Sequence, residues 1–372
     1  MNMMERPVSV MAKPLPGKIA SRLLAASASI VCFLPVPALA KAEITGLNIF
    51  GDSLMDAGNL FNLTGLPPSP PYDQKLSNGK IWVEQVADAL DLEPALSTDV
   101  LPGLFAGTTL LPTDGINFAF GGSLSSDVNV GSSLLPGLRQ QIETFGVLSA
   151  LAPPDPDALY LLLAGGNDYN EAFFNPAALT VPLDLLPNQV TDNLANAVAA
   201  LVGAGAKHVL VSNLPDLSLQ PFVATLNQAN PESAALLSGL SAQHNQLLAQ
   251  KLTALEATSG ADIIELDLNG LFAKAIENPA SFGFKNVTES CLTNFQPRFV
   301  FDGICENPDE FLFWDNVHPT EAGHGAIAQL ALKTIADKDA AEEVPEPAGV
   351  LGLMAGAGAI AVMVRRRSLK VA

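Results

Sequence analysis

The chain has 372 residues, of which 48% are hydrophobic and only 15% are charged. This composition suits a globular protein with a sizeable buried core, and it excludes a disordered chain or a coiled coil, because both need far more charge. The formal net charge is −19, so the chain lacks the basic surface that nucleic-acid binding requires, and anionic lipid headgroups should repel it.

The N-terminal segment has the pattern of a secretory signal peptide. Basic residues, the last of them Lys18 and Arg22, precede an uncharged run over residues 23–39, and small residues stand at Ala38 and Ala40. A basic start, a short apolar run and an Ala-x-Ala end are typical of a signal that signal peptidase removes. We therefore expect residues 1–40 to be cleaved and the protein to be exported; a retained membrane anchor is the alternative.

Between residues 41 and 340 the sequence alternates short apolar runs with longer amphipathic ones. The short runs, rich in β-branched residues, predict strands, and the amphipathic runs predict helices. This alternation favours one domain of three-layer α/β architecture with a parallel sheet. The expected strands are residues 44–50, 116–120, 158–163, 209–212 and 262–267, and the expected helices are residues 81–90, 135–148, 188–202, 231–258 and 320–338.

Two cysteines, Cys291 and Cys305, remain once the expected signal peptide is removed, and both lie in a long insertion expected over residues 278–313. An even pair of cysteines in an exported protein most often forms a disulfide. Closing a loop of about 15 residues would stabilise the fold by about 3 kcal/mol in the chain-entropy model. The spacing does not fit a zinc site or a Cys-x-x-Cys redox motif.

The C-terminal segment combines three features in a fixed order. Residues 345–347 (Pro-Glu-Pro) precede an uncharged run over residues 348–364, and residues 365–367 are three arginines. As a helix, the uncharged run would measure about 26 Å, which is just enough to cross the hydrocarbon core of a bilayer. Its length and its lack of charge predict a C-terminal transmembrane helix, and the positive-inside rule places the three arginines in the cytoplasm.

The same order resembles the PEP-CTERM sorting signal of Gram-negative bacteria, whose tail a membrane protease called exosortase removes. The resemblance implies that residues 341–372 are a sorting segment with a transmembrane helix. It also implies a transient stage at the inner membrane, followed by the cell surface or the extracellular space. An ordinary permanent C-terminal anchor is the alternative.

Small and polar residues follow four of the predicted strands, and three of these groups carry the functional argument. Ser53, the pair Gly121 and Gly122, and Asn167 each come just after such a strand. Because ligands bind at the carboxyl ends of parallel strands, these residues should meet in one crevice if their strands are neighbours. A serine in a strand-to-helix turn suits acyl transfer, since the helix aims its positive end at developing charge. No Gly-x-Ser-x-Gly motif surrounds any serine, which excludes an ordinary α/β-hydrolase site.

A serine nucleophile needs a base, and one histidine has a suitable neighbour. Asp315 precedes His318 by three residues, so within one turn the carboxylate can hold the Nδ1 proton while Nε2 faces the serine. The other histidines are expected elsewhere: His208 at the start of a strand, away from the crevice, and His244 on the surface of a long helix. His324 is expected one turn into the last helix.

Four blocks in order resemble the GDSL, or SGNH, hydrolases. The blocks are residues 50–54 (Phe-Gly-Asp-Ser-Leu), 117–122 (Asn-Phe-Ala-Phe-Gly-Gly), 165–168 (Gly-Gly-Asn-Asp) and 315–318 (Asp-Asn-Val-His). Other short segments look like the plant-type and lecithinase/haemolysin-like branch. The resemblance spans residues 44 to about 335 and implies a three-layer α/β/α, flavodoxin-like fold. It also implies a secreted carboxylic-ester hydrolase, whose substrate is a lipid, a short-chain acyl ester or an acetylated glycan.

By this resemblance Ser53 is the nucleophile, His318 the base and Asp315 the acid that orients the base. The oxyanion hole would consist of the Ser53 amide, the Gly122 amide and the Asn167 side chain, with the other glycine of the pair as the alternative. The resemblance implies no cofactor and no metal, and the sequence contains no calcium-loop or His-Glu-x-x-His motif.

Two other functions stay open at this point. PEP-CTERM proteins resemble components of extracellular-matrix systems, which makes an exopolysaccharide O-deacetylase the second enzymatic candidate. From a different class, the chain could be a structural protein of the surface or matrix with a relic site, although retention of all five site residues argues against this. The expected partners are an ester substrate, signal peptidase and an exosortase-type protease, and not nucleic acid.

Overall fold

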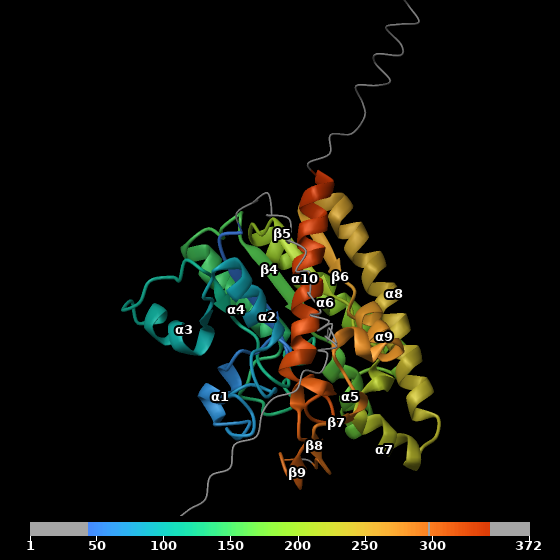
Figure 1. Ribbon diagram of the computed structural model, residues 1–372. Coiled ribbons are helices and arrows are strands. Elements are labelled where there is room, and N and C mark those ends of the chain that lie inside the picture. The colour runs from blue at the N-terminus through green and yellow to red at the C-terminus, as the bar shows by residue number, and fades with distance from the viewer. Residues whose placement is uncertain (1–43, 297, 343–372) are drawn as a thin grey trace, which may run out of the picture. The chain divides into compact units, whose positions relative to one another are not determined.

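The computed structural model describes residues 44–296 and 298–342, and a six-stranded sheet lies at its centre (Figure 1). The strands run in the order β2–β3–β1–β4–β5–β6, and every pair of neighbours is parallel. The predicted α/β fold with a parallel sheet is confirmed. The bounds are β1 (Leu47–Gly51), β2 (Ala95–Leu96), β3 (Ile116–Asn117), β4 (Leu159–Leu163), β5 (His208–Ser212) and β6 (Asp262–Leu266).

The expected signal peptide, residues 1–40, lies outside the described residues, and so does the expected sorting segment beyond residue 342. Within residues 44–296 and 298–342, no helix is both long enough and apolar enough to span a membrane. Export and sorting therefore stay predictions that rest on the sequence.

Helices cover both faces of the sheet. The α-helices of the described residues are α1 (Asn59–Thr64), α2 (Trp82–Leu90), α3 (Ser97–Phe105), α4 (Leu138–Leu151), α5 (Gly166–Phe174), α6 (Leu186–Ala204), α7 (Pro221–Ala229), α8 (Ser233–Ser259), α9 (Leu268–Glu277) and α10 (Glu321–Glu342). The helices α4, α6 and α8 share a core with one face, and α2, α9 and α10 share a core with the other. The architecture is therefore the expected three-layer one.

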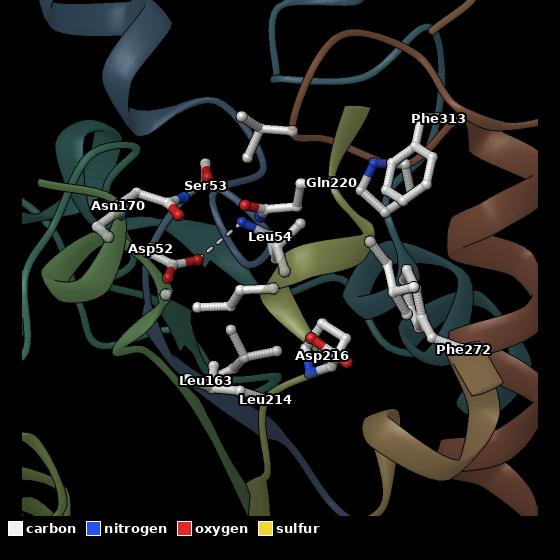
Figure 2. A pocket seen from close by; sticks show the side chains of 17 residues that line it. Asp52, Ser53, Leu54, Leu163, Asn170, Leu214, Asp216, Gln220, Phe272 and Phe313 are labelled. Atoms are coloured by element: carbon white, nitrogen blue, oxygen red, sulfur yellow. Dashed lines mark hydrogen bonds between the residues drawn. The ribbon is translucent and has the colours of Figure 1, made fainter. Parts of the chain in front are cut away.

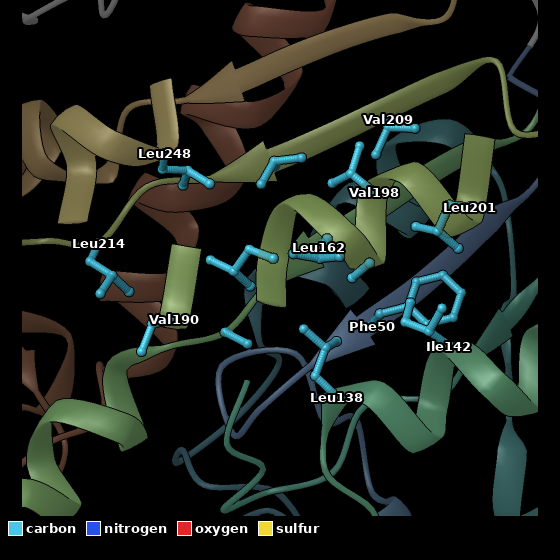
Figure 3. Close-up of a cluster of buried hydrophobic side chains, with 14 of the residues drawn as sticks. Phe50, Leu138, Ile142, Leu162, Val190, Val198, Leu201, Val209, Leu214 and Leu248 are labelled. Carbon is cyan, nitrogen blue, oxygen red and sulfur yellow. The ribbon is translucent and has the colours of Figure 1, made fainter. Parts of the chain in front are cut away.

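Each face of the sheet buries one hydrophobic cluster. Adjacent strand residues point to opposite faces; in β1, Phe50 joins the cluster of α4, α6 and α8, whereas Ile49 joins the cluster of α2, α9 and α10. Figure 3 shows the first cluster, with Phe50 and Leu162 of the sheet, Ile142 of α4 and Val198 of α6. The strand β4 is buried on both faces along its whole length, and its sequence is therefore continuously apolar rather than alternating.

The predicted strand over residues 116–120 is shorter than expected, since β3 ends at Asn117. The chain continues beside β1, and the Phe118 amide donates to Ile49 O at 2.7 Å. On the other side, however, the carbonyls of Asn117 and Ala119 accept hydrogen bonds from the Asn59 side chain at 2.8 and 3.0 Å. A side chain from α1 thus takes the place of a neighbouring strand at this position.

The insertion after α9 carries two small sheets. Its strands are β7 (Asn286–Ser290) paired with β10 (Phe311–Phe313), and β8 (Leu292–Thr293) paired with β9 (Gly303–Ile304). The expected disulfide joins Cys291 to Cys305. Cys291 is fully buried in a small cluster with Tyr72 and Trp314, the residue just before Asp315. The disulfide-linked insertion therefore packs directly behind the Asp-x-x-His block.

Candidate active site

Ser53 lies in the turn after β1, at the carboxyl edge of the sheet between β3 and β4. The Asp52 amide donates to Leu163 O of β4, and the Asp52 carboxylate accepts a hydrogen bond from the Leu54 amide at 3.0 Å. Gly51 has a φ of 148°, and a Cβ there would lie 1.9 Å from Leu163 O, so only glycine fits. These contacts fix the backbone that presents the serine.

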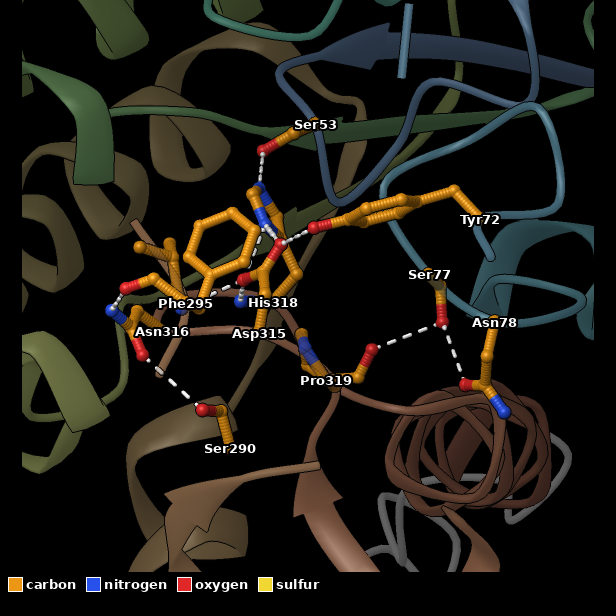
Figure 4. A network of polar contacts seen from close by, with 11 residues as sticks. Ser53, Tyr72, Ser77, Asn78, Ser290, Phe295, Asp315, Asn316, His318 and Pro319 are labelled. Carbon is orange, nitrogen blue, oxygen red and sulfur yellow. Dashed lines mark hydrogen bonds and ion pairs between the residues drawn. The ribbon is translucent and has the colours of Figure 1, made fainter. Parts of the chain in front are cut away.

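The side chains of Ser53, His318 and Asp315 form one continuous hydrogen-bonded chain (Figure 4). His318 Nε2 lies 2.9 Å from Ser53 Oγ, and His318 Nδ1 lies 2.9 Å from each carboxylate oxygen of Asp315. Since an ionised carboxylate only accepts hydrogen bonds, Nδ1 carries the proton and Nε2 accepts from the serine hydroxyl. The structure therefore brings together residues that are 265 positions apart in the chain.

The Asp315 carboxylate is almost completely buried and accepts hydrogen bonds from several donors. Besides His318 Nδ1, the amides of Val317 and His318 donate to Oδ1 at 2.9 and 2.8 Å, and the Tyr72 hydroxyl donates to Oδ2 at 2.7 Å. Burial alone would raise the pKa of Asp315, but the charge of His318 and the hydrogen bonds from His318 and the Val317 amide outweigh it, so the pKa is lowered. The carboxylate is ionised at neutral pH.

The electrostatic surroundings of His318 favour its protonated form. Burial alone would lower its pKa, but the charge and hydrogen bond of Asp315, and then the charge of Asp52, raise the pKa above 6.5. Asp52 itself is buried, and burial raises its pKa to about 7. Two carboxylates thus raise the pKa of the imidazole beside Ser53, one in direct contact with it and one on the serine's own turn.

Tyr72 is a site residue that the sequence analysis missed. Its ring is 2% exposed and packs edge-on against Trp314 and Phe299, with ring centroids 6.1 and 5.3 Å away. Burial, and then the Asp315 carboxylate, raise the pKa of Tyr72 far above 10. The phenol therefore stays protonated and donates a hydrogen bond to Asp315. The available signal was its place directly after the Pro-rich stretch of residues 67–71, which fixes the path of the loop.

The glycine pair after β3 differs in what its amides contact. The Gly121 amide donates to Asp56 Oδ2 at 2.8 Å, and the same carboxylate also binds the first turn of α1. Within the described part of the chain, the amides of Gly122 and Ser53 donate no hydrogen bond. A developing oxyanion needs free N–H donors, so this difference favours Gly122 over Gly121.

Ser53 lies at the cavity drawn in Figure 2. Asn167, in the first turn of α5 after β4, lines the same cavity. Its side-chain amide donates one hydrogen bond to Ser123 O at 3.0 Å, which fixes the side chain and leaves its second N–H. The cavity measures about 40 Å³, and most of its walls are apolar side chains. Gly122 is not among the residues that line this cavity, so the structure brings Ser53 and Asn167 together there without it.

The sequence profile of the GDSL-like lipase/acylhydrolase family matches residues 47–331. The chain belongs to this family. It is therefore a carboxylic-ester hydrolase.

Several curated proteins are similar to this GDSL hydrolase over most of its length. GDSL esterase/lipase 5 of Arabidopsis thaliana is 26% identical and aligns over 87% of this chain and 93% of its own. Phosphatidylcholine-sterol acyltransferase of Aeromonas hydrophila is 27% identical and aligns over 81% and 95%. Among solved structures, the acetyl xylan esterase AlAXEase is 15% identical with a TM-score of 0.40, and the match covers 78% of this chain and 99% of that one.

The other histidines of this GDSL hydrolase lie outside the hydrogen-bonded chain, and one prediction about them was wrong. His244 is fully buried rather than on the surface, because its Nδ1 pairs with the Tyr169 hydroxyl at 2.9 Å beneath α5. Burial lowers the pKa of both His244 and His324 to about 3, so both stay neutral. His208 begins β5, as predicted, and pairs with Asp262 at 3.7 Å.

Within residues 44–296 and 298–342, no group of three or more His, Cys, Asp or Glu side chains is placed to hold a metal ion.

Proposed function

We propose that this GDSL hydrolase cleaves carboxylic esters with Ser53 as nucleophile, His318 as general base and Asp315 as the residue that orients the base. The observation that carries the proposal is the unbroken chain of contacts from Ser53 Oγ through His318 to Asp315, each at 2.9 Å. Serine alone is a weak nucleophile, and a base held within hydrogen-bond distance is the arrangement that activates it.

In the first half of the reaction, Ser53 Oγ attacks the ester carbonyl while its proton passes to His318 Nε2. The imidazolium that forms is stabilised by the ionised Asp315 carboxylate, which the Tyr72 hydroxyl and two backbone amides hold in place. His318 then gives the proton to the leaving alcohol, and an acyl-serine remains. In the second half, His318 takes a proton from water as the water oxygen attacks the acyl carbonyl. The bond between the acyl carbon and Ser53 Oγ then breaks, His318 returns the proton to Ser53 Oγ, and the carboxylic acid leaves.

We assign the oxyanion hole to the Ser53 amide, the Gly122 amide and the Asn167 side chain. Both backbone amides are free of protein acceptors in the described residues, and the Asn167 amide is already oriented by Ser123 O. Donors that are fixed in advance stabilise the oxyanion at no reorganisation cost, and one such donor is typically worth about 3 kcal/mol of barrier.

We further propose that the protein works outside the cytoplasm. The signal-like residues 1–40 support export. The Pro-Glu-Pro segment near residue 345 supports removal of the tail by an exosortase-type protease. The buried disulfide between Cys291 and Cys305 also supports export, since such bonds persist in oxidising compartments.

The test is hydrolysis of an ester panel, from acetyl to palmitoyl esters and acetylated sugars, by protein with and without Ser53→Ala. We expect Ser53→Ala and His318→Ala to lower kcat by several orders of magnitude, and Asp315→Ala to lower it less. Near-full activity of Ser53→Ala would contradict the assignment. Absence of turnover on every ester would contradict the proposed reaction.

A further inference from the structure

The cavity beside Ser53 contains more polar groups than the proposed reaction uses. Asp52 and Asp216 line it, and both carboxylates have protein partners: Asp52 accepts from the Leu54 amide, and Asp216 accepts from the Ser218 amide and the Ser238 hydroxyl at 2.9 and 2.7 Å. These two acids are therefore occupied in holding the walls of the cavity.

Two side-chain amides also line this cavity, and unlike the two acids each has a buried oxygen without a hydrogen-bond partner in the described part of the chain. Among the described residues, Asn170 Oδ1 and Gln220 Oε1 are buried carbonyl oxygens without any hydrogen-bond partner. Asn170 is a buried residue, 7% exposed, and Gln220 is partly buried. Proteins rarely leave such acceptors unpaired, because an unpaired buried carbonyl loses its hydration and gains nothing in return.

The two amides come from separate elements that both face the cavity. Asn170 lies on α5 three residues after Asn167, so the two asparagines share one face of the helix. Gln220 directly precedes α7, at the end of the loop from Leu214 that forms another part of the lining. Figure 2 shows Asn170 beside Ser53 and Gln220 beside Leu54.

The rest of the cavity strengthens any hydrogen bond made there. Its walls are largely apolar, with Leu163 and Leu214 on one side and Phe272 and Phe313 on another (Figure 2). A hydrogen bond in such surroundings is stronger than in water, and an unpaired acceptor costs more.

We propose that Asn170 and Gln220 form a specificity subsite that accepts hydrogen bonds from substrate hydroxyl groups. The preferred substrate is then an ester that carries a hydroxyl within a few bonds of the scissile carbonyl. The inference rests on the proposed function of Ser53 and adds the substrate class. A site built to pair with a hydroxyl discriminates strongly against an analogue without it, because its own buried groups are then left unpaired.

The hydroxyl can belong to the acyl group or to the alcohol, and two matched pairs of esters distinguish these sources. On the acyl side, p-nitrophenyl glycolate is compared with p-nitrophenyl propionate; on the alcohol side, glycerol monoacetate is compared with propyl acetate. Each kcat/KM is divided by the rate of hydroxide-catalysed hydrolysis of the same ester, which removes differences in intrinsic reactivity.

The variants Asn170→Leu and Gln220→Met keep the size of each side chain and remove its amide. Gln250→Met is the matched control, since Gln250 is an exposed glutamine on α8 that does not line the cavity. Thermal unfolding of each variant shows that it is folded.

We expect the wild type to favour the hydroxyl-bearing ester of at least one pair by about tenfold or more. Asn170→Leu or Gln220→Met should bring this ratio close to one, and Gln250→Met should leave the ratio unchanged. A ratio near one for both pairs in the wild type, or a preference that survives both variants, would overturn the inference. Absence of Ser53-dependent turnover on all four esters would instead contradict the proposed function.

Discussion

Replacing Tyr72 by phenylalanine removes one hydrogen bond to Asp315 and little else. The phenol donates to Asp315 Oδ2 at 2.7 Å, both residues are 2% exposed, and the edge-on contact with Trp314 needs no hydroxyl. A hydrogen bond to a charged group contributes about 1.5–3 kcal/mol, and here no water can replace the lost donor. We expect the free energy of unfolding to fall by about 2 kcal/mol, which lowers Tm by about 4–8 °C.

The same change acts on catalysis through the charge of Asp315. Without the phenol, the carboxylate attracts the imidazolium more strongly, so the pKa of His318 rises further above 6.5. A general base must be neutral, and activity therefore falls as pH drops through this pKa. The acid limb of kcat/KM should move to higher pH in Tyr72→Phe, measured with p-nitrophenyl acetate from about pH 5 to about pH 9.

Tyr160→Phe is the control, because it deletes a hydroxyl that bonds to Asp155 O at 3.1 Å near the amino end of β4. This neutral hydrogen bond is worth about 1 kcal/mol, so Tm should fall while the acid limb stays where it is. An acid limb that is unmoved, or moved to lower pH, in Tyr72→Phe would refute the argument, since a purely structural tyrosine would affect stability alone.

Three further predictions follow from the contacts around the site and from the sequence of the tail. Burial raises the pKa of Asp52 from 3.8 to about 7, so its ionisation destabilises the fold as pH rises through that range. Asp52→Asn should therefore have a higher Tm than the wild type at about pH 8 but not at about pH 4. The acid limb of kcat/KM should move to lower pH in this variant, because Asp52 raises the pKa of His318. Equal Tm differences at both pH values would contradict the stability prediction. Reduction of the Cys291–Cys305 disulfide should lower the free energy of unfolding by about 3 kcal/mol and lower activity, measured by thermal unfolding and ester hydrolysis with and without reductant; an unchanged Tm would count against it. Intact-mass analysis of protein from its native host should show loss of residues 1–40 and of everything beyond about residue 347. Retention of the arginine cluster at residues 365–367 would contradict removal of the tail and support a permanent C-terminal anchor instead.

The sequence predicted the layers of the fold because burial on both faces leaves a strong local signal. The strands β1, β4, β5 and β6 each contain adjacent apolar residues, and each strand was expected within about three residues of its actual bounds. The strand β2 was missed because it has only two residues, and α5 was missed because it begins inside a Gly-rich block that reads as a turn.

The site was predictable where its geometry is local. Asp315 and His318 are three residues apart, so one turn sets their contact, and Gly51 marks the tight turn before Ser53. Tyr72 was not predictable in this way, because its bond to Asp315 joins residues 243 positions apart.

Long-range burial also explains the error at His244. Its polar neighbours on α8 indicate a solvated surface, but its partner Tyr169 lies 75 positions away on α5. Nothing in the local pattern shows that α8 turns this face toward α5. Buried polar pairs between distant elements are thus the part of the site that a single sequence conceals.

The proposed reaction depends on acylation of Ser53 with the help of His318, and covalent labelling of activated serines reports on this step. The protein is treated with a p-nitrophenyl phosphonate, which reacts with activated serines, and the labelled peptide is identified by mass spectrometry. We predict one phosphonate per chain, on the peptide that contains Ser53, with no label in Ser53→Ala and much slower labelling in His318→Ala. Labelling of a different residue, or undiminished labelling of Ser53→Ala, would contradict the account.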